Sequence, residues 1–214
     1  MFLHEIMKGA DPSHLAFTGD IDVTYGALED AIHRYRNAIY ALGVREGERV
    51  SLYSANCAEF VYAFMAVVSL GAIIVPVNNS LVDREVDYIL KDSGSTLLIT
   101  DTPMDVSVPS ISIEELDEKS HEPLPEAPAF PKALTEDDVC ALIYTSGTTG
   151  SPKGAMLTHK NLVRNVEQFT ARIIFRPEDK VLCVLPMFHC YGMTTIVHGS
   201  LYAHSCLLYT SDAA

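Results

Sequence analysis

The chain has 214 residues, of which 48 % are hydrophobic, enough to form the core of one large domain or two small ones. This composition is that of a globular protein and not of a disordered one. The 28 acidic residues outnumber the 15 basic ones and give a formal net charge of −13. Because phosphate backbones are bound by clustered Lys and Arg, we expect no nucleic-acid partner.

The first predicted helix begins after Thr24, which can cap it, and ends at Gly43. Its apolar residues recur at helical spacing, at Leu28, Ile32, Tyr35, Ile39 and Leu42. A strand is predicted at residues 49–53.

The most apolar part of the sequence, residues 60–77, approaches the length of a membrane-spanning helix. Its flanking residues indicate a different structure. Asn56 and Glu59 resemble a capping box at a helix start, and Gly71 is a natural helix end. Residues 72–77 are short and rich in branched side chains, as in a buried strand. We therefore predict a helix and a strand in a globular core, and no transmembrane segment.

Helices and strands continue to alternate, with a helix near residues 83–91, a stop at Gly94 and a strand at 96–100. Such alternation is typical of crossover units in a parallel sheet. We predict an α/β fold with a mostly parallel sheet layered with helices.

The pattern lapses at residues 102–138, where six of the eleven prolines occur among many acidic residues. We predict a Pro-rich acidic surface connection there, without chemistry of its own. Strands are then predicted at 139–144, 155–157 and 180–185. Thr158 can cap a helix between the last two, with an apolar stripe at Leu162, Val166, Phe169 and Ile173.

The five cysteines are far apart, odd in number and without metal-ligand spacing: Cys57, Cys140, Cys183, Cys190 and Cys206. We expect free thiols and a reducing, cytoplasmic location. The first residues also lack the basic and apolar segments of a signal peptide.

The loop YTSGTTGSPKG, residues 144–154, follows the predicted strand 139–144. Its three glycines, at positions 147, 150 and 154, let the backbone approach a ligand and direct successive N–H groups at an anion. Hydroxyl groups and the positive charge of Lys153 complete the features of a polyphosphate site. It is not a Walker A loop, since Lys153 follows Gly150 by three residues and precedes Gly154.

Three segments resemble conserved motifs of the adenylate-forming superfamily, which includes acyl-CoA synthetases, peptide-synthetase adenylation domains and luciferases. Residues 144–159 are similar to its AMP-binding signature, LPMFHCYG at 185–192 to its next motif, and VPVN at 75–78 to an earlier one. The resemblance extends from about residue 24 to residue 201. It implies the N-terminal part of the large domain of these enzymes.

The resemblance implies that a carboxylic acid reacts with ATP and Mg²⁺ to form an acyl-adenylate, and that coenzyme A then accepts the acyl group. By position in the motif, Thr145 would also reach the metal, and His189 would lie beside the pocket for the acid. An ordinary, partly buried histidine is the alternative for His189. The residues implied to hold the β- and γ-phosphates are Thr145, Ser146, Gly147, Thr148, Thr149, Gly150 and Lys153.

Members of this superfamily are more than twice as long, and their adenine pocket, ribose-binding Asp, acidic metal ligand and catalytic Lys have no match here. We therefore expect residues 1–204 to be a partial adenylation domain that holds no catalytic residue and is inactive alone. Residues 205–214 resemble translated sequencing-adapter read-through, which predicts a non-native tail. The oligomeric state is left open, with a homodimer as one option.

The motif at 185–192 and the apolar helix after it favour a fatty acid as the substrate. Two alternatives remain open: an adenylation domain for amino or aryl acids, and a nucleotide-binding module without catalysis. Coding sequence that continues beyond about Ser205 would argue against the module.

Overall fold

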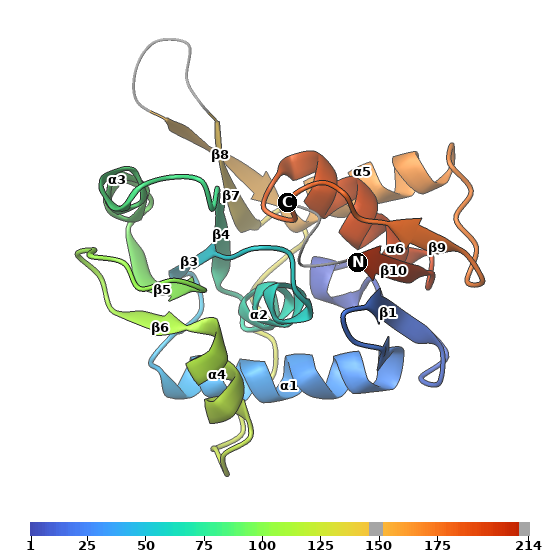
Figure 1. Ribbon diagram of the computed structural model, residues 1–214, viewed down its shortest axis with the longest axis horizontal. Coiled ribbons are helices and arrows are strands. Elements are labelled where there is room, and N and C mark those ends of the chain that lie inside the picture. The colour runs from blue at the N-terminus through green and yellow to red at the C-terminus, as the bar shows by residue number, and fades with distance from the viewer. Residues whose placement is uncertain (146–151, 210–214) are drawn as a thin grey trace.

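The computed structural model describes residues 1–145 and 152–209, which form two sheets with helices between and around them (Figure 1). The larger sheet has six strands in the order β6-β5-β3-β4-β7-β8. All neighbours in it are parallel except β7 and β8, which form a hairpin. The strands are β3 (Arg49–Tyr53), β4 (Ile73–Val77), β5 (Ser95–Thr100), β6 (Ser110–Ser112), β7 (Val139–Thr145) and β8 (Lys153–Thr158).

The smaller sheet has four strands in the order β2-β1-β10-β9. Only the β1–β2 pair is antiparallel within it. The strands are β1 (Leu15–Gly19), β2 (Val23–Thr24), β9 (Lys180–Leu182) and β10 (Cys206–Tyr209). The two sheets are mostly parallel and layered with helices, so the predicted α/β class is confirmed.

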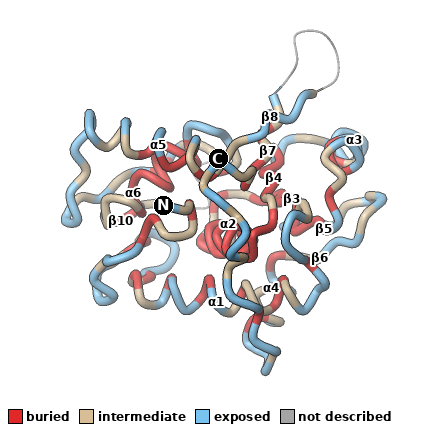
Figure 2. The backbone as a smooth tube through the Cα atoms, turned by 180° about the vertical axis from the view of Figure 1, so that it is seen from behind, coloured by how far each residue is buried: buried red, intermediate tan, exposed pale blue. Residues whose placement is uncertain are grey.

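Helix α2 (Ala58–Ser69) lies in the middle of the molecule, beside α1 (Tyr25–Ala41), and Figure 2 shows it among the most buried segments. Every residue from Phe60 to Ser69 is buried. The apolar run in the sequence therefore corresponds to a core helix followed by β4, as predicted. Within residues 1–145 and 152–209, no helix is long and apolar enough to cross a membrane.

Most of the predicted helix boundaries agree with the structure. The Thr24 hydroxyl accepts a hydrogen bond from the N–H of Ala27 at 3.2 Å and caps α1. Gly43 and Gly94 take positive φ values of 99° and 66° just after α1 and α3 (Asp83–Ser93), where glycine has no steric penalty. Thr158 caps α5 (His159–Thr170).

Three predicted elements end earlier in the structure than expected. Leu42 follows the last turn of α1 and is 36 % exposed, so it does not belong to the buried stripe. Ile173 likewise lies beyond the end of its helix, α5, and is 47 % exposed, so it does not belong to the buried stripe of that helix. The strand predicted at 180–185 ends at Leu182, although the N–H of Cys183 still bonds to the carbonyl of Leu208.

The Pro-rich connection contains more structure than its composition indicates. It includes β6 and the helix α4 (Ile113–Ser120), whose start is a capping box between Ser112 and Glu115. The buried residues Ile113 and Leu116 hold α4 against the core. Short elements such as these have too few residues for a clear periodic pattern.

The described fold continues past residue 204. Residues 206–209 form β10, which lies between β1 and β9 at the centre of the smaller sheet. Residues 210–214 lie outside the described part of the chain. The remaining helical elements are η1 (Leu3–Glu5), the π-helix η2 (Gly192–His198) and α6 (Gly199–Tyr202).

Candidate functional site

A cavity of about 340 Å³ lies where β4 and β7 end. The carboxyl ends of parallel strands are the usual place for ligands in open α/β sheets. Thr145, from the end of β7, and His189, from the segment after β9, both line this cavity. The other lining residues are Pro76, Val77, Asn78, Leu81, Ile89, Ile143, Tyr144, Pro152, Phe188 and Cys190.

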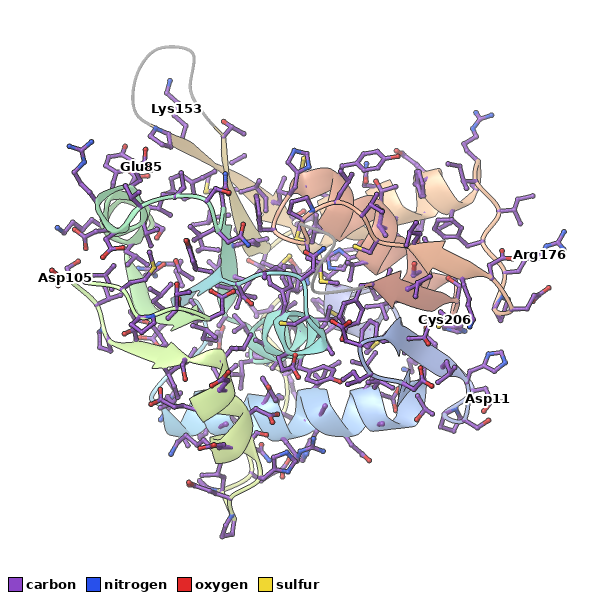
Figure 3. All side chains as sticks on the ribbon, in the orientation of Figure 1. Asp11, Glu85, Asp105, Lys153, Arg176 and Cys206 are labelled. Atoms are coloured by element: carbon purple, nitrogen blue, oxygen red, sulfur yellow. The ribbon has the colours of Figure 1, made fainter. Side chains whose placement is uncertain are left out.

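The β7–β8 hairpin projects from the body of the protein and carries the predicted phosphate loop (Figure 1). Thr145 pairs with Lys153 in the antiparallel ladder. Lys153 is exposed near the projecting end of β8 (Figure 3), and it is not part of the cavity lining. The predicted phosphate-binding residues between these two positions lie outside the described residues: Ser146, Gly147, Thr148, Thr149 and Gly150.

Gly154 lies against the ring of Tyr144, a contact that the sequence did not predict. It lies in β8 opposite Tyr144, and its φ is not positive. A Cβ atom at this position would be 3.0 Å from Cζ of the Tyr144 ring. The glycine therefore makes room for the tyrosine.

Helix α3 holds the loop end of the hairpin through two tyrosines. The Tyr144 hydroxyl donates a hydrogen bond to Oδ2 of Asp92 at 2.6 Å, and the Tyr88 hydroxyl donates one to the carbonyl of Pro152 at 3.4 Å. Burial raises the pKa of Tyr144, and the hydrogen bond to Asp92 raises it further. The Tyr144 hydroxyl is therefore a neutral donor at physiological pH. The two tyrosines together hold the two strands that lead into the loop.

His189 is exposed and lies at the start of the segment that leads into η2. Its N–H bonds to the carbonyl of Pro186 at 3.1 Å, and its carbonyl accepts from the N–H of Met193 at 2.9 Å. The ring atom Nδ1 accepts from the N–H of Tyr191 at 3.3 Å. In the neutral ring the proton is therefore on Nε2, where it can be donated to a ligand.

Asn56 is a residue that the sequence analysis assigned incorrectly. It does not cap α2, because the cap is Cys57, whose sulfur accepts from the N–H of Phe60 at 3.3 Å. The Asn56 amide instead bonds to Leu185 and Met187, just before His189. Asparagine before a helix is usually a cap, so local sequence offered no signal for this contact.

A second cavity, of about 620 Å³, lies between α5 and η2. Cys190 lines both cavities, so the two adjoin at the residue that follows His189. Among the described residues, neither lining includes Asp, Glu, Lys or Arg. The residues around the second cavity are Leu157, Asn161, Leu162, Asn165, Gln168, Phe169, Cys190, Tyr191, Thr194 and Thr195.

All five cysteines are free thiols in the structure. Burial raises the pKa of Cys140 to about 12 and that of Cys183 to about 11, so both are neutral and unreactive at physiological pH. The described residues contain no group of three or more His, Cys, Asp or Glu side chains that could hold a metal ion. Thr145 can supply a single hydroxyl oxygen, a ligand type that suits Mg²⁺.

The described chain is thus an α/β domain with a cavity where β4 and β7 end, lined by residues of the β7–β8 hairpin and of the segment after β9. The model of the family described as AMP-binding enzyme matches residues 7–214. The chain belongs to this family.

Known proteins with similar sequences include ligases of coenzyme A. The chain is 32 % identical over 196 residues to the long-chain-fatty-acid–CoA ligase FadD13 of Mycobacterium tuberculosis, covering 85 % of this chain and 39 % of that protein. It is 36 % identical over 188 residues to the crotonobetaine/carnitine–CoA ligase of Salmonella enteritidis, with 78 % and 36 % covered. The chain thus spans well under half of the length of these relatives.

The fold also matches a solved member of this group. The O-succinylbenzoate coenzyme A synthetase MenE of Bacillus subtilis, in complex with AMP, superposes with a TM-score of 0.86 at 29 % identity. The match covers 98 % of this chain and 55 % of that one. The acids named for these three proteins differ, so the family alone does not define the substrate.

Proposed function

We propose that the protein containing this chain activates a carboxylic acid with ATP and transfers the acyl group to coenzyme A. The observation that carries this proposal is the position of Thr145 and His189 on one cavity, beside the hairpin of the AMP-binding signature. One end of the cavity would hold phosphate and the other the acid.

The reaction has two steps. An oxygen of the carboxylate attacks the α-phosphorus of ATP, and the bond between the α- and β-phosphates breaks to release pyrophosphate. The thiol of coenzyme A then attacks the acyl carbon, its proton passes to solvent, and AMP leaves. Charge neutralisation and alignment dominate catalysis of such a displacement.

The residues of the hairpin loop would bind and orient the phosphates. Backbone N–H groups and hydroxyls from Thr145 to Gly150 would neutralise charge on the β- and γ-phosphates, with Lys153 as an added positive charge. Mg²⁺, when bound, would neutralise phosphate charge, and Thr145 would contribute its hydroxyl to it. His189 would donate from Nε2 to the carboxylate, which orients the acid and needs no proton transfer.

A fatty acid is the substrate class that we favour. The two adjoining cavities offer space for a chain, and their described lining lacks a carboxylate to pair with the ammonium group of an amino acid. An aryl acid is the second candidate, because the aromatic rings of Phe188 and Tyr144 line the first cavity.

We also propose a cytoplasmic location, which the free thiols support.

The test is acid-dependent exchange between ATP and labelled pyrophosphate, measured on the complete open reading frame that contains this chain. We expect exchange with medium- or long-chain fatty acids, and formation of the CoA thioester when coenzyme A is added. Exchange with amino acids alone would contradict the fatty-acid proposal. ATP binding without exchange for any acid would favour a non-catalytic nucleotide-binding module.

A further inference from the structure

The side chain of Asn56 connects two segments that are far apart in the sequence. Asn56 follows β3, and its Nδ2 donates a hydrogen bond to the carbonyl of Leu185 at 3.0 Å. Its Oδ1 accepts from the N–H of Met187 at 2.7 Å. Asn56 is only 9 % exposed, so these bonds are shielded from water. Both ends of the amide are therefore used on one short piece of backbone.

The backbone at residues 185–187 cannot continue as an ordinary strand. Pro186 has no N–H group, and its carbonyl is bonded to the N–H of His189. The two groups that flank Pro186, the carbonyl of Leu185 and the N–H of Met187, both pair with Asn56. A carboxamide offers a donor and an acceptor side by side, and thus replaces the edge of a neighbouring strand.

This contact links the two sheets. Asn56 comes from the end of β3 in the six-stranded sheet, whereas Leu185 and Met187 follow β9 in the four-stranded sheet. Met187 is 1 % exposed and belongs to the core. The segment is therefore held by the bonds of its backbone to Asn56 and by the packing of the Met187 side chain. Phe188 and His189, the next two residues, reach the strand-end cavity.

We propose that Asn56 is a positioning residue: it fixes residues 185–187 so that His189 faces the cavity beside Thr145. This inference rests on the proposed function for its catalytic consequence, but its structural part stands on the two hydrogen bonds alone. Asn56 does not line the cavity itself. It acts on the bound acid through His189.

The structural part is tested on the 214-residue chain. Cys183 is fully buried, and its thiol donates to the carbonyl of Leu185 at 3.5 Å, so its alkylation by iodoacetamide reports release of the segment. Cys140, which is 1 % exposed in β7, reports unfolding of the core. Peptide mass spectrometry measures alkylation of both thiols in one sample. Hydrogen exchange of the Met187 amide measures opening of its bond to Asn56 directly.

Asn56→Ala removes both bonds, whereas Asn56→Asp keeps an acceptor for the Met187 N–H. Loss of a buried hydrogen bond corresponds to roughly a tenfold change in a local opening equilibrium. We expect Asn56→Ala to speed alkylation of Cys183 and exchange of the Met187 amide about tenfold, with Cys140 unchanged. Asn56→Asp is expected to protect the Met187 amide better than Asn56→Ala.

Asn37→Ala is the matched control. Asn37 likewise accepts from the N–H of a distant residue, Ala127, at 2.9 Å, but this half-buried bond is made from α1 and involves neither Leu185 nor Met187. It is expected to leave Cys183 unchanged. Unchanged Cys183 and Met187 in both Asn56 variants would overturn the proposal. Equal acceleration of Cys183 and Cys140 would also overturn it, because Asn56 would then stabilise the core in general.

The catalytic part is tested in the complete enzyme by pyrophosphate exchange. Asn56→Ala is expected to raise KM for the acid roughly tenfold and to leave KM for ATP within about twofold, because the hairpin is not touched. Asn56→Asp is expected to recover part of the loss. An equal rise of both KM values would overturn the positioning role. Absence of exchange in the wild type would contradict the proposed function, while the alkylation experiment would still decide the role of Asn56.

Discussion

The Tyr144 hydroxyl lies 2.6 Å from Oδ2 of Asp92, and this bond joins β7 to α3 at the loop end of the hairpin. Tyr144 also lies against Gly154 of β8, so one side chain contacts the helix and both strands of the hairpin. The positions of Thr145 and Lys153, the next pair in the ladder, depend on it.

The first prediction concerns this bond. Tyr144→Phe keeps the ring and removes the hydroxyl, and we expect it to lower the free energy of unfolding by about 1 kcal/mol. Tyr88→Phe is the matched control on α3, since its bond to Pro152 is longer, at 3.4 Å, and a smaller loss is expected. Urea unfolding of the wild type and the two variants measures both losses of free energy. A larger loss for Tyr88→Phe would contradict the assigned role of Tyr144.

The fold was largely predictable from the sequence where local signals agree with tertiary packing. Thr24 and Gly43 delimit α1 because a cap and a positive-φ glycine are local requirements. The apolar run of α2 was assigned to the core from its flanking residues, and its burial confirms this. The parallel sheet followed from the alternation of helix and strand.

The site was predictable only in part, since its geometry depends on contacts between distant residues. The motifs identified Thr145 and His189, but not the bonds from Asn56, which span 129 and 131 residues. Gly154 was assigned to ligand approach because a glycine in a loop motif has no local sign of the ring that it accommodates.

The second prediction concerns Gly192, at the start of η2. A Cβ atom here would lie 2.4 Å from the carbonyl oxygen of Pro186, so the backbone before His189 would have to move. We expect Gly192→Ala to destabilise the protein by about 2 kcal/mol. Gly199→Ala is the control, because its Cβ would meet the edge of the Phe175 ring at 3.2 Å, which can shift. Thermal unfolding of both variants measures the two losses of stability. Equal losses would argue against a tight contact at Gly192.

The third prediction concerns the phosphate loop in the complete enzyme. Loss of one fixed donor to a developing charge typically costs roughly 10²- to 10³-fold in rate, so Thr149→Ala should reduce pyrophosphate exchange by about that factor. Lys153→Ala should cost less, because Lys153 is exposed and its charge is screened. Rates and melting temperatures are measured together. A rate loss matched by a similar loss of stability in both variants would show that the loop is structural.

The last prediction concerns His159, the first residue of α5, whose ring is buried against the N-terminal segment. Its Nδ1 accepts from the N–H of Leu3 at 3.2 Å, and burial lowers its pKa to about 4. In the unfolded chain the pKa returns to about 6.5, so the unfolded state binds a proton first as the pH falls. The stability that the neutral ring contributes is therefore complete above about pH 6.5 and is lost progressively down to about pH 4, by about 3 kcal/mol for this residue. His159→Gln keeps an acceptor and cannot titrate, so its free energy of unfolding should decline less between pH 7 and pH 4.5 than that of the wild type. Urea unfolding across this pH range measures the difference, and parallel curves for the wild type and His159→Gln would show that His159 does not titrate in this way.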